Sequence, residues 1–291
     1  MSDNTIKASS LRKNDTGLKV AIYIVSIFFS IMTLFPFVMM LANCFKSSDE
    51  VQQSALTFWS ADPIGNFKKN WTFIMSKEFK PAVGFVNSFI IATCSTLLNV
   101  YFSSLTAYAI SAYEWKFRDA FNGMIMAIMM IPGTVTTIGF YQMVYKLGLV
   151  NKLSMLILPA IAAPMTVFFM RQYLQATLSM EIVQSARIDG AGEFRIFNQI
   201  VVPLMKPAIA TQAIFGYVAS WNQLFTPLIL LTNKKKATLP MMVDLLNGDI
   251  YRTEFGSIYL GLSITVLPLI IVYAFLSRYI VEGVALGGVK S

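Results

Sequence analysis

The stretch that decides the fold runs from Pro81 to Tyr113 and reads PAVGFVNSFIIATCSTLLNVYFSSLTAYAISAY. It contains no Asp, Glu, Lys or Arg, and it is bounded by Lys80 and Glu114. A helix rises about 1.5 Å per residue, so about 20 apolar residues cross the hydrocarbon layer of a bilayer. Because a backbone in lipid must satisfy its own hydrogen bonds, this run predicts a membrane-spanning helix.

Further charge-free runs lie on both sides of this one, at residues 20–45, 120–145, 153–170, 207–233 and 255–277. Charged residues make up only 13% of the chain, against about 25% in soluble domains, and they fall between the runs. One such run also fits a buried helix of a soluble protein, but six in series do not. The sequence predicts an all-α integral membrane protein with six transmembrane helices, the fourth kinked by Pro159 and Pro164.

The ends of the chain are predicted to lie outside the spans. Residues 1–19 are polar and are predicted to be a disordered tail, residues 20–281 form the six-helix domain, and residues 282–291 form a second tail. The first apolar run is too long for the core of a cleaved signal peptide. If both tails lie inside, the inner segments carry 12 Lys and Arg and the outer ones 23 − 12 = 11, so the positive-inside rule does not decide the orientation.

Several kinds of chemistry lack the residues they need. The chain has no His, no G-x-x-x-x-G-K-[ST] loop for nucleotide phosphates and no ionisable residue inside a predicted span. No metal site, cofactor or catalytic residue is predicted, and no basic and aromatic platform indicates nucleic acid. Energy for transport is therefore expected to come from a partner protein.

The most informative segment between spans is RQYLQATLSMEIVQSARIDGAGEFRIFNQIVVPLMK, residues 171–206, and its central part is the loop of residues 178–203. Ser179 is a suitable N-cap, Glu181 suits the positive end of a helix, and Gly190 is a natural helix stop. A second short helix is predicted to carry Phe194, Phe197 and Val201 on one face and to end at Pro203. From the pattern alone, two interpretations stay open: a projection that docks into a groove on a partner, and an amphipathic loop on the membrane surface.

The segment resembles the cytoplasmic signature of binding-protein-dependent ABC importer permeases, E-A-A-x-x-x-G, nine residues, then I-x-L-P. Here it reads Gln184-Ser185-Ala186, three residues, Gly190, nine residues, then Ile200-Val201-Val202-Pro203. The spacing agrees throughout, but Gln184 replaces the family's Glu and Ser185 its first Ala. Because that Glu helps to bind the ATPase in the family, Glu181 or Glu193 is the carboxylate expected to compensate.

Two further stretches resemble the carbohydrate branch of the family, the maltose-transporter-type permeases. They are GYVASWNQLFTPLILLTN at residues 216–233 and SRYIVEGVALGGVKS at residues 277–291. The resemblance covers about residues 178–291 by motif, and the first half of the chain agrees mainly in hydropathy. It implies the type I ABC importer permease fold with a cytoplasmic coupling helix.

The resemblance also implies partners and a place. They are a second homologous permease, two cytoplasmic ATPase subunits that hydrolyse ATP, an extracytoplasmic solute-binding protein and membrane lipid. The chain itself is expected to be a non-enzymatic transport subunit of the cell membrane with both termini cytoplasmic. Lys234, Lys235 and Lys236 would then face outward, either on the binding protein or as helix-end anchors. The expected ATPase-docking residues are Glu181, Gln184, Ser185, Ala186, Arg187, Asp189, Gly190, Ala191 and Glu193.

The residues that contact solute are expected near the end of the fifth span and in the third. On a continuous helix, Gln212, Gly216, Ser220, Gln223 and Pro227 share one face, which serves either helix packing or a polar cavity. The candidates for the substrate path are Ser220, Asn222, Gln223 and Thr137.

Three other functions are weighed against this one. A secondary transporter or channel working alone is disfavoured by the signature segment and by the lack of charge inside the spans. A membrane enzyme is disfavoured because no metal-ligand cluster or pair of intramembrane carboxylates is present. Within the ABC importers, a permease for amino acids, peptides or another small solute is the main alternative to a carbohydrate permease.

Overall fold

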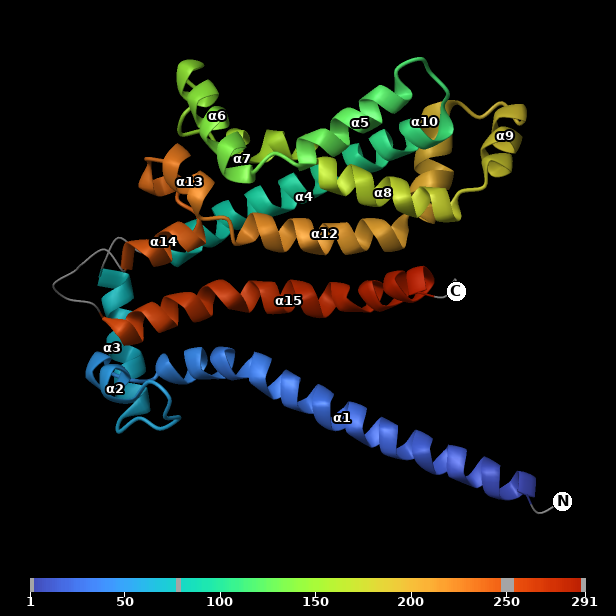
Figure 1. Cartoon of the computed structure of the whole chain (residues 1–291). Helices are drawn as coiled ribbons and strands as arrows, with labels where there is room; N and C mark the ends of the chain where they lie inside the picture. The colour runs from blue at the N-terminus through green and yellow to red at the C-terminus, as the bar shows by residue number, and fades with distance from the viewer. Residues whose placement is uncertain (1–2, 77–79, 247–253, 289–291) are drawn as a thin grey trace. The chain divides into compact units, whose positions relative to one another are not determined.

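The computed structural model describes residues 3–76, 80–246 and 254–288, and every regular element in these ranges is a helix (Figure 1). The all-α prediction is confirmed. Four segments are long and apolar enough to cross a membrane: Gly17–Asn43, Pro81–Ala112, Ser154–Thr177 and Phe255–Ala274. Two bent helix pairs pass the same test only if each pair is taken as one span. The described residues therefore carry between four and six spans.

The elements divide into two compact units. The first unit contains α1 (Asp3–Asn43), α2 (Ser48–Ser54), α3 (Pro63–Ser76) and the first turns of α15 (Phe255–Gly288). Its centre is polar: the buried Asn70 amide donates to the carbonyl oxygens of Cys44 and Lys46, at 2.9 and 3.0 Å. A Cβ on Gly256 would lie 2.3 Å from the Lys46 carbonyl oxygen and 2.5 Å from Nδ2 of Asn70, so only glycine lets α15 start this close to the α1–α2 connection and α3.

The second unit is built around α4 (Pro81–Ala112), which contacts α8 and α12 along its length (Figure 1). Small residues on α4, among them Ala92, Ser95, Ser103 and Ala107, are buried and let the helix backbones approach closely. The other elements are α5 (Arg118–Met129), α6 (Gly133–Lys146), α7 (Ser154–Ile157), η1 (Leu158–Ile161), α8 (Pro164–Thr177), α9 (Met180–Ile188), α10 (Glu193–Ile196), η2 (Phe197–Val201), α11 (Val202–Leu204), α12 (Lys206–Trp221), α13 (Phe225–Leu230), η3 (Lys234–Lys236) and α14 (Leu239–Leu246).

The ends of the chain differ from the prediction. The segment 1–19, predicted to be disordered, continues α1 as helix from Asp3, and α15 continues as helix to Gly288, through most of the predicted tail 282–291. Charge patterning marks where a helix can enter lipid, but it does not stop the helix, and neither junction carries a Pro.

The third predicted span is two helices rather than one. α5 and α6 meet at an angle of 99° across Met130, Ile131 and Pro132. Pro132 lacks a backbone N–H and disfavours helical backbone at the residue before it, so α5 ends and α6 restarts directly after the proline. In the fourth span, Pro159 and Pro164 each fall in the first turn of a new helical segment, which fits the predicted kink.

The predicted helix over 207–233 is wrong beyond Trp221. α12 ends there, and the chain restarts as α13 at Phe225. Pro227 explains the restart: inside a continuous helix it would leave the carbonyl of Gln223 without a donor, whereas in the first turn of α13 no donor is needed. At the other end, α12 meets the helix Glu193–Leu204 at 79°.

Candidate functional site

The segment between α8 and α12 forms the two short helices that the sequence predicts. Ser179 takes extended backbone angles, and its hydroxyl accepts a hydrogen bond from the Glu181 N–H at 3.3 Å, which caps α9. Gly190 follows the last turn with a φ of +79°, a conformation that L-residues with a side chain rarely adopt. The Gly190 N–H bonds to the Arg187 carbonyl oxygen at 3.0 Å. The N-cap and the stop are therefore confirmed.

The second helix differs from the prediction in two ways. Phe197 and Val201 are buried, but Phe194 is 72% exposed and does not share their face. Residues Phe197–Val201 form a π-helical turn, wider than an α turn, and the inner face is completed by Ile196 instead. Pro203 does not end the helix either. It lies in the first turn of α11, which ends at Leu204.

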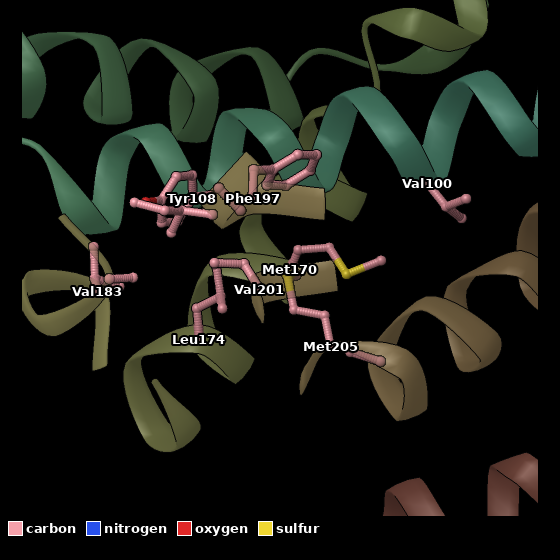
Figure 2. Packing of buried hydrophobic residues seen from close by; sticks show 12 residues of the cluster. Val100, Tyr108, Met170, Leu174, Val183, Phe197, Val201 and Met205 are labelled. Atoms are coloured by element: carbon pink, nitrogen blue, oxygen red, sulfur yellow. The ribbon is translucent and has the colours of Figure 1, made fainter. Parts of the chain in front are cut away.

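A buried apolar cluster lies under this segment and joins it to the membrane helices (Figure 2). Val183 of α9 is fully buried with Met170 and Leu174 of α8, and the same cluster takes in Val100 and Tyr108 of α4. Ala186 belongs to the cluster, and Ala191 packs against it. Ala186 is therefore buried, whereas Ala191 is partly exposed at the edge of the cluster.

Arg187 and Glu193 are satisfied inside the chain. The Arg187 Nε donates to Glu193 Oε1 at 2.6 Å, and its guanidinium lies 5.2 Å from the centre of the Tyr113 ring. The other carboxylate oxygen accepts from the hydroxyls of Tyr108, at 3.2 Å, and Tyr113. We call these four residues the brace, because they tie both short helices to the end of α4.

The charge state of the brace follows from these bonds. The hydrogen bond from Arg187 lowers the pKa of Glu193 below its usual value, and the same bond raises the pKa of Arg187. Both groups are thus held in their charged forms. Glu193 accepts three bonds from its own chain, and its side chain remains 44% exposed.

The outward surface of the segment combines apolar and polar side chains. Ile188 is 86% exposed and Ile182 is 49% exposed, next to the exposed Phe194. Of the predicted docking residues, Glu181, Gln184, Ser185, Asp189, Gly190 and Glu193 are also exposed. We call α9 together with Phe194 the docking face. Ile182 and Ile188 were missed in the sequence analysis, although apolar residues on a short polar helix are a recognisable signal.

Three of the four candidate substrate-path residues lie at the break between α12 and α13. Ser220 is half-buried in the last turn of α12, and Asn222 and Gln223 are exposed in the break. The shared helical face predicted for residues 212–227 is wrong beyond Ser220, because the helix does not continue. Trp221 anchors the break: it is 1% exposed, stacks on Tyr217 at 5.9 Å, and donates from Nε1 to the Thr265 carbonyl oxygen at 3.1 Å.

Thr137 stands apart from the other three. Its hydroxyl donates to the Gly133 carbonyl oxygen at 2.9 Å, within α6. α6 contacts α13, the helix after the break. Within the described residues, Thr137 forms no hydrogen bond with Ser220, Asn222 or Gln223.

The segment with the three lysines is hydrogen-bonded to Asn87 and Ser88 at the start of α4, and we call this attachment the clasp. The buried Asn87 amide donates to the carbonyl oxygens of Lys235 and Ala237, at 3.1 and 3.0 Å. Ser88 Oγ accepts from the Leu239 N–H at 2.9 Å. Lys236 donates to the Asn151 carbonyl oxygen. The segment is therefore fixed to α4 by its backbone.

Comparison with known proteins gives consistent matches over most of the chain. A family model described as "Binding-protein-dependent transport system inner membrane component" matches residues 99–285. The chain is 34% identical over 263 residues to the "Arabinooligosaccharides transport system permease protein AraQ" of Halalkalibacterium halodurans, covering 90% of this chain and 93% of that protein. It is 31% identical to the "Melibiose/raffinose/stachyose import permease protein MelC" of Bacillus subtilis, covering 88% and 91%.

The fold is shared with solved structures. One is a chain of a bacterial ABC transporter involved in the import of the acidic polysaccharide alginate, which superposes with a TM-score of 0.76 at 21% identity. That match covers 91% of this chain and 97% of the other. A second is an alginate ABC transporter in complex with an alginate pentasaccharide-bound periplasmic protein, with a TM-score of 0.62 at 16% identity.

Proposed function

Because this chain belongs to the family of binding-protein-dependent transport system inner membrane components, we propose that α9 couples it to a partner ATPase while its spans form part of the solute pathway. The chain is a multi-pass membrane protein and a permease subunit of an ABC importer for carbohydrate, and it is not itself an enzyme. Several relatives are named for oligosaccharides, so the solute we propose is an oligosaccharide.

The observation that carries the docking proposal is the contrast between the two sides of α9. Its inner side is buried, with Val183 fully enclosed, while Ile188 on the outer side is 86% exposed. An exposed apolar face on a helix that is fixed from behind suits docking into a groove on a partner. The exposed carboxylate of Glu181 takes the role of the missing Glu at position 184.

The remaining parts of the assembly follow from the family. The two bent helix pairs count as one span each, which gives six spans with both termini in the cytoplasm. A second, homologous permease completes the pathway, two ATPases bind the docking faces, and an extracytoplasmic binding protein delivers the solute. Asn222 and Gln223 at the break, with Ser220 and Thr137, supply hydrogen-bonding groups to the solute's hydroxyls.

The orientation is tested by labelling single cysteines in intact cells with a thiol reagent that cannot cross the membrane. Lys69, Lys235 and Arg195 are exposed sites on three different segments. We expect Lys69→Cys and Lys235→Cys to react, and Arg195→Cys to react only after the membrane is permeabilised. The reverse pattern would contradict the orientation and remove the docking assignment with it.

The docking role is tested at Gly190. A Cβ added there meets nothing within 4 Å, so a substitution acts only through the positive φ. Valine at this φ is strained by about 1–3 kcal/mol, whereas asparagine tolerates it. We expect Gly190→Val to insert normally, to recover little ATPase on purification and to reduce sugar uptake to background.

Gly190→Asn is the matched control and should keep both assembly and uptake. If Gly190→Val behaved as the wild type in both measurements, α9 would not be the coupling element. If Gly190→Val lost uptake while the ATPase was still recovered in full, the role of α9 in docking would be rejected, but its role in uptake would not.

A further inference from the structure

An open pocket of about 420 Å³ lies in the second unit, behind the docking face. Its walls come from the last turn of α4, the first residue of α5, the end of α8 and the start of α9. The residues that matter here are Ser111, Arg118, Arg171 and Gln175. The volume lies within the range of small-ligand sites.

Two polar atoms in this wall are buried without a hydrogen-bond partner among the described residues. They are the Nε of Arg171 and the Oγ of Ser111, from α8 and α4 respectively. A buried donor left unpaired destabilises a fold, and a charged one most of all. Both are N–H or O–H donors of residues that line the same pocket, so its wall holds two donors that no described group of the chain uses.

The charged side chains in the pocket wall indicate which kind of ligand the pocket can bind. Arg118 supplies a second guanidinium, and its Nε lies 3.3 Å from Oδ1 of Asp119. Asp119 is 93% exposed and does not line the pocket, and no carboxylate is among the described residues that do. Two guanidiniums, a hydroxyl and the Gln175 amide suit an oxyanion, because guanidinium groups bind phosphate through paired hydrogen bonds.

The position of the pocket points to the membrane as the source of that oxyanion. Ile110 and Ser111 end the span of α4, and Arg171 and Leu174 lie in the last turns of the span Ser154–Thr177. The connection beside the pocket carries the exposed Trp115 and Phe117 with Lys116. Aromatic and basic residues gather at the level of the lipid headgroups, where they contact both acyl chains and phosphates.

We propose that Arg171, Arg118 and Ser111 bind the phosphate of an anionic phospholipid headgroup. The site holds one lipid against α8 and the base of α9. In the orientation proposed above, this lipid comes from the cytoplasmic leaflet, but the binding itself does not depend on that orientation. Lipid bound here steadies the inner support of the docking face.

The test uses the complex of this chain with its partner subunits, stripped of lipid and titrated with phosphatidylglycerol under native mass spectrometry. Arg171→Gln keeps most of the side-chain length and removes the charge. We expect at least about tenfold weaker retention of phosphatidylglycerol, the size of one lost charge-assisted hydrogen bond. Arg195→Gln is the matched control, since Arg195 is exposed and its Nε binds Gln199 outside the pocket, and it should bind lipid as the wild type does.

Further arms separate the sources of the anion. Phosphatidylcholine, whose headgroup carries its own cation, should bind more weakly than phosphatidylglycerol, and inorganic phosphate should not displace the lipid. Ser111→Ala covers the case that Arg171→Gln does not assemble, and it should weaken retention about three- to tenfold. The proposal would be overturned if Arg171→Gln and Ser111→Ala both retained phosphatidylglycerol as the wild type does, or if inorganic phosphate displaced the lipid. A cross-link from Arg171→Cys to an acidic segment of a partner subunit would also overturn it.

Discussion

The segment between α8 and α12, which we call the docking segment because of its proposed role, and the break between α12 and α13 both interrupt apolar helices with polar residues. Different kinds of interaction fix their backbones. In the docking segment Ser179, Arg187 and Glu193 are engaged within the chain, by the cap and by the brace, while Glu181, Gln184 and Asp189 are exposed. In the break, Asn222 and Gln223 are exposed, and a single apolar anchor, Trp221, fixes the backbone. The first region therefore depends on a fixed shape, and the second offers hydrogen-bonding groups on a fixed backbone.

Removing the anchor of the break is expected to have the largest effect. Trp221→Ala leaves a cavity at a side chain that is 1% exposed, and such changes cost about 3–5 kcal/mol. Trp221→Phe keeps an aromatic ring against Tyr217 and loses the bond to the Thr265 carbonyl, which costs about 1 kcal/mol. Thermal unfolding of the purified complex measures both. If Trp221→Ala were as stable as Asn222→Ala, the anchor would lie elsewhere.

The polar groups of the break are expected to act on solute and not on stability. Asn222→Ala should leave the melting temperature unchanged and raise the half-saturating sugar concentration about two- to tenfold, the size of one hydrogen bond. Thr137→Val should have a smaller effect, because the Thr137 hydroxyl already bonds within its own helix. Uptake of labelled sugar over a concentration series gives both numbers. An unchanged half-saturation in Asn222→Ala would remove it from the substrate path.

Loosening the brace is expected to have the smallest effect. Glu193→Gln removes an ion pair that is partly exposed, worth roughly 0.2–1 kcal/mol, so coupling should fall at most about fivefold. The measurement is the stimulation of ATP hydrolysis by the loaded binding protein. Glu114→Gln is the control, since Glu114 is an exposed carboxylate directly after Tyr113 in the chain. An equal loss in both variants would indicate a general charge effect and not the brace.

The helix cap and the helix stop of the docking segment could be predicted from sequence. The partners of its charged side chains and the exposure of its apolar side chains could not. Ser179 as a cap and Gly190 at positive φ follow from residue type alone, and both are confirmed. The contacts of Arg187 and Glu193 with Tyr108 and Tyr113 could not be predicted, because nothing nearby in sequence shows that these tyrosines reach them. The spacing placed Phe194 on one face with Phe197 and Val201, but it could not show that Phe194 is exposed while the other two are buried.

The spans show the same division. Charge-free runs located each of the four segments that are long and apolar enough to cross a membrane, since the cost of a charge in lipid is a property of composition. They could not locate the end of α12, because Asn222 and Gln223 are uncharged and the run continues past them. The signal that was available is Pro227, which forces a helix to restart shortly before it.

The clasp at one end of α4 and the brace at the other fix two points on this helix at a known separation. Asn87, which holds the backbone of residues 235–237, and Tyr108, which bonds to Glu193, are separated by about 32 Å of helix rise. That distance is close to the roughly 30 Å thickness of the hydrocarbon layer. A helix hydrogen-bonded throughout resists stretching, so α4 can tilt or slide but cannot absorb a displacement at one end. In a bilayer thicker or thinner than this length, the hydrogen bonds of the clasp and of the brace would be strained. A mismatch in membrane thickness would therefore act on the support of the docking face.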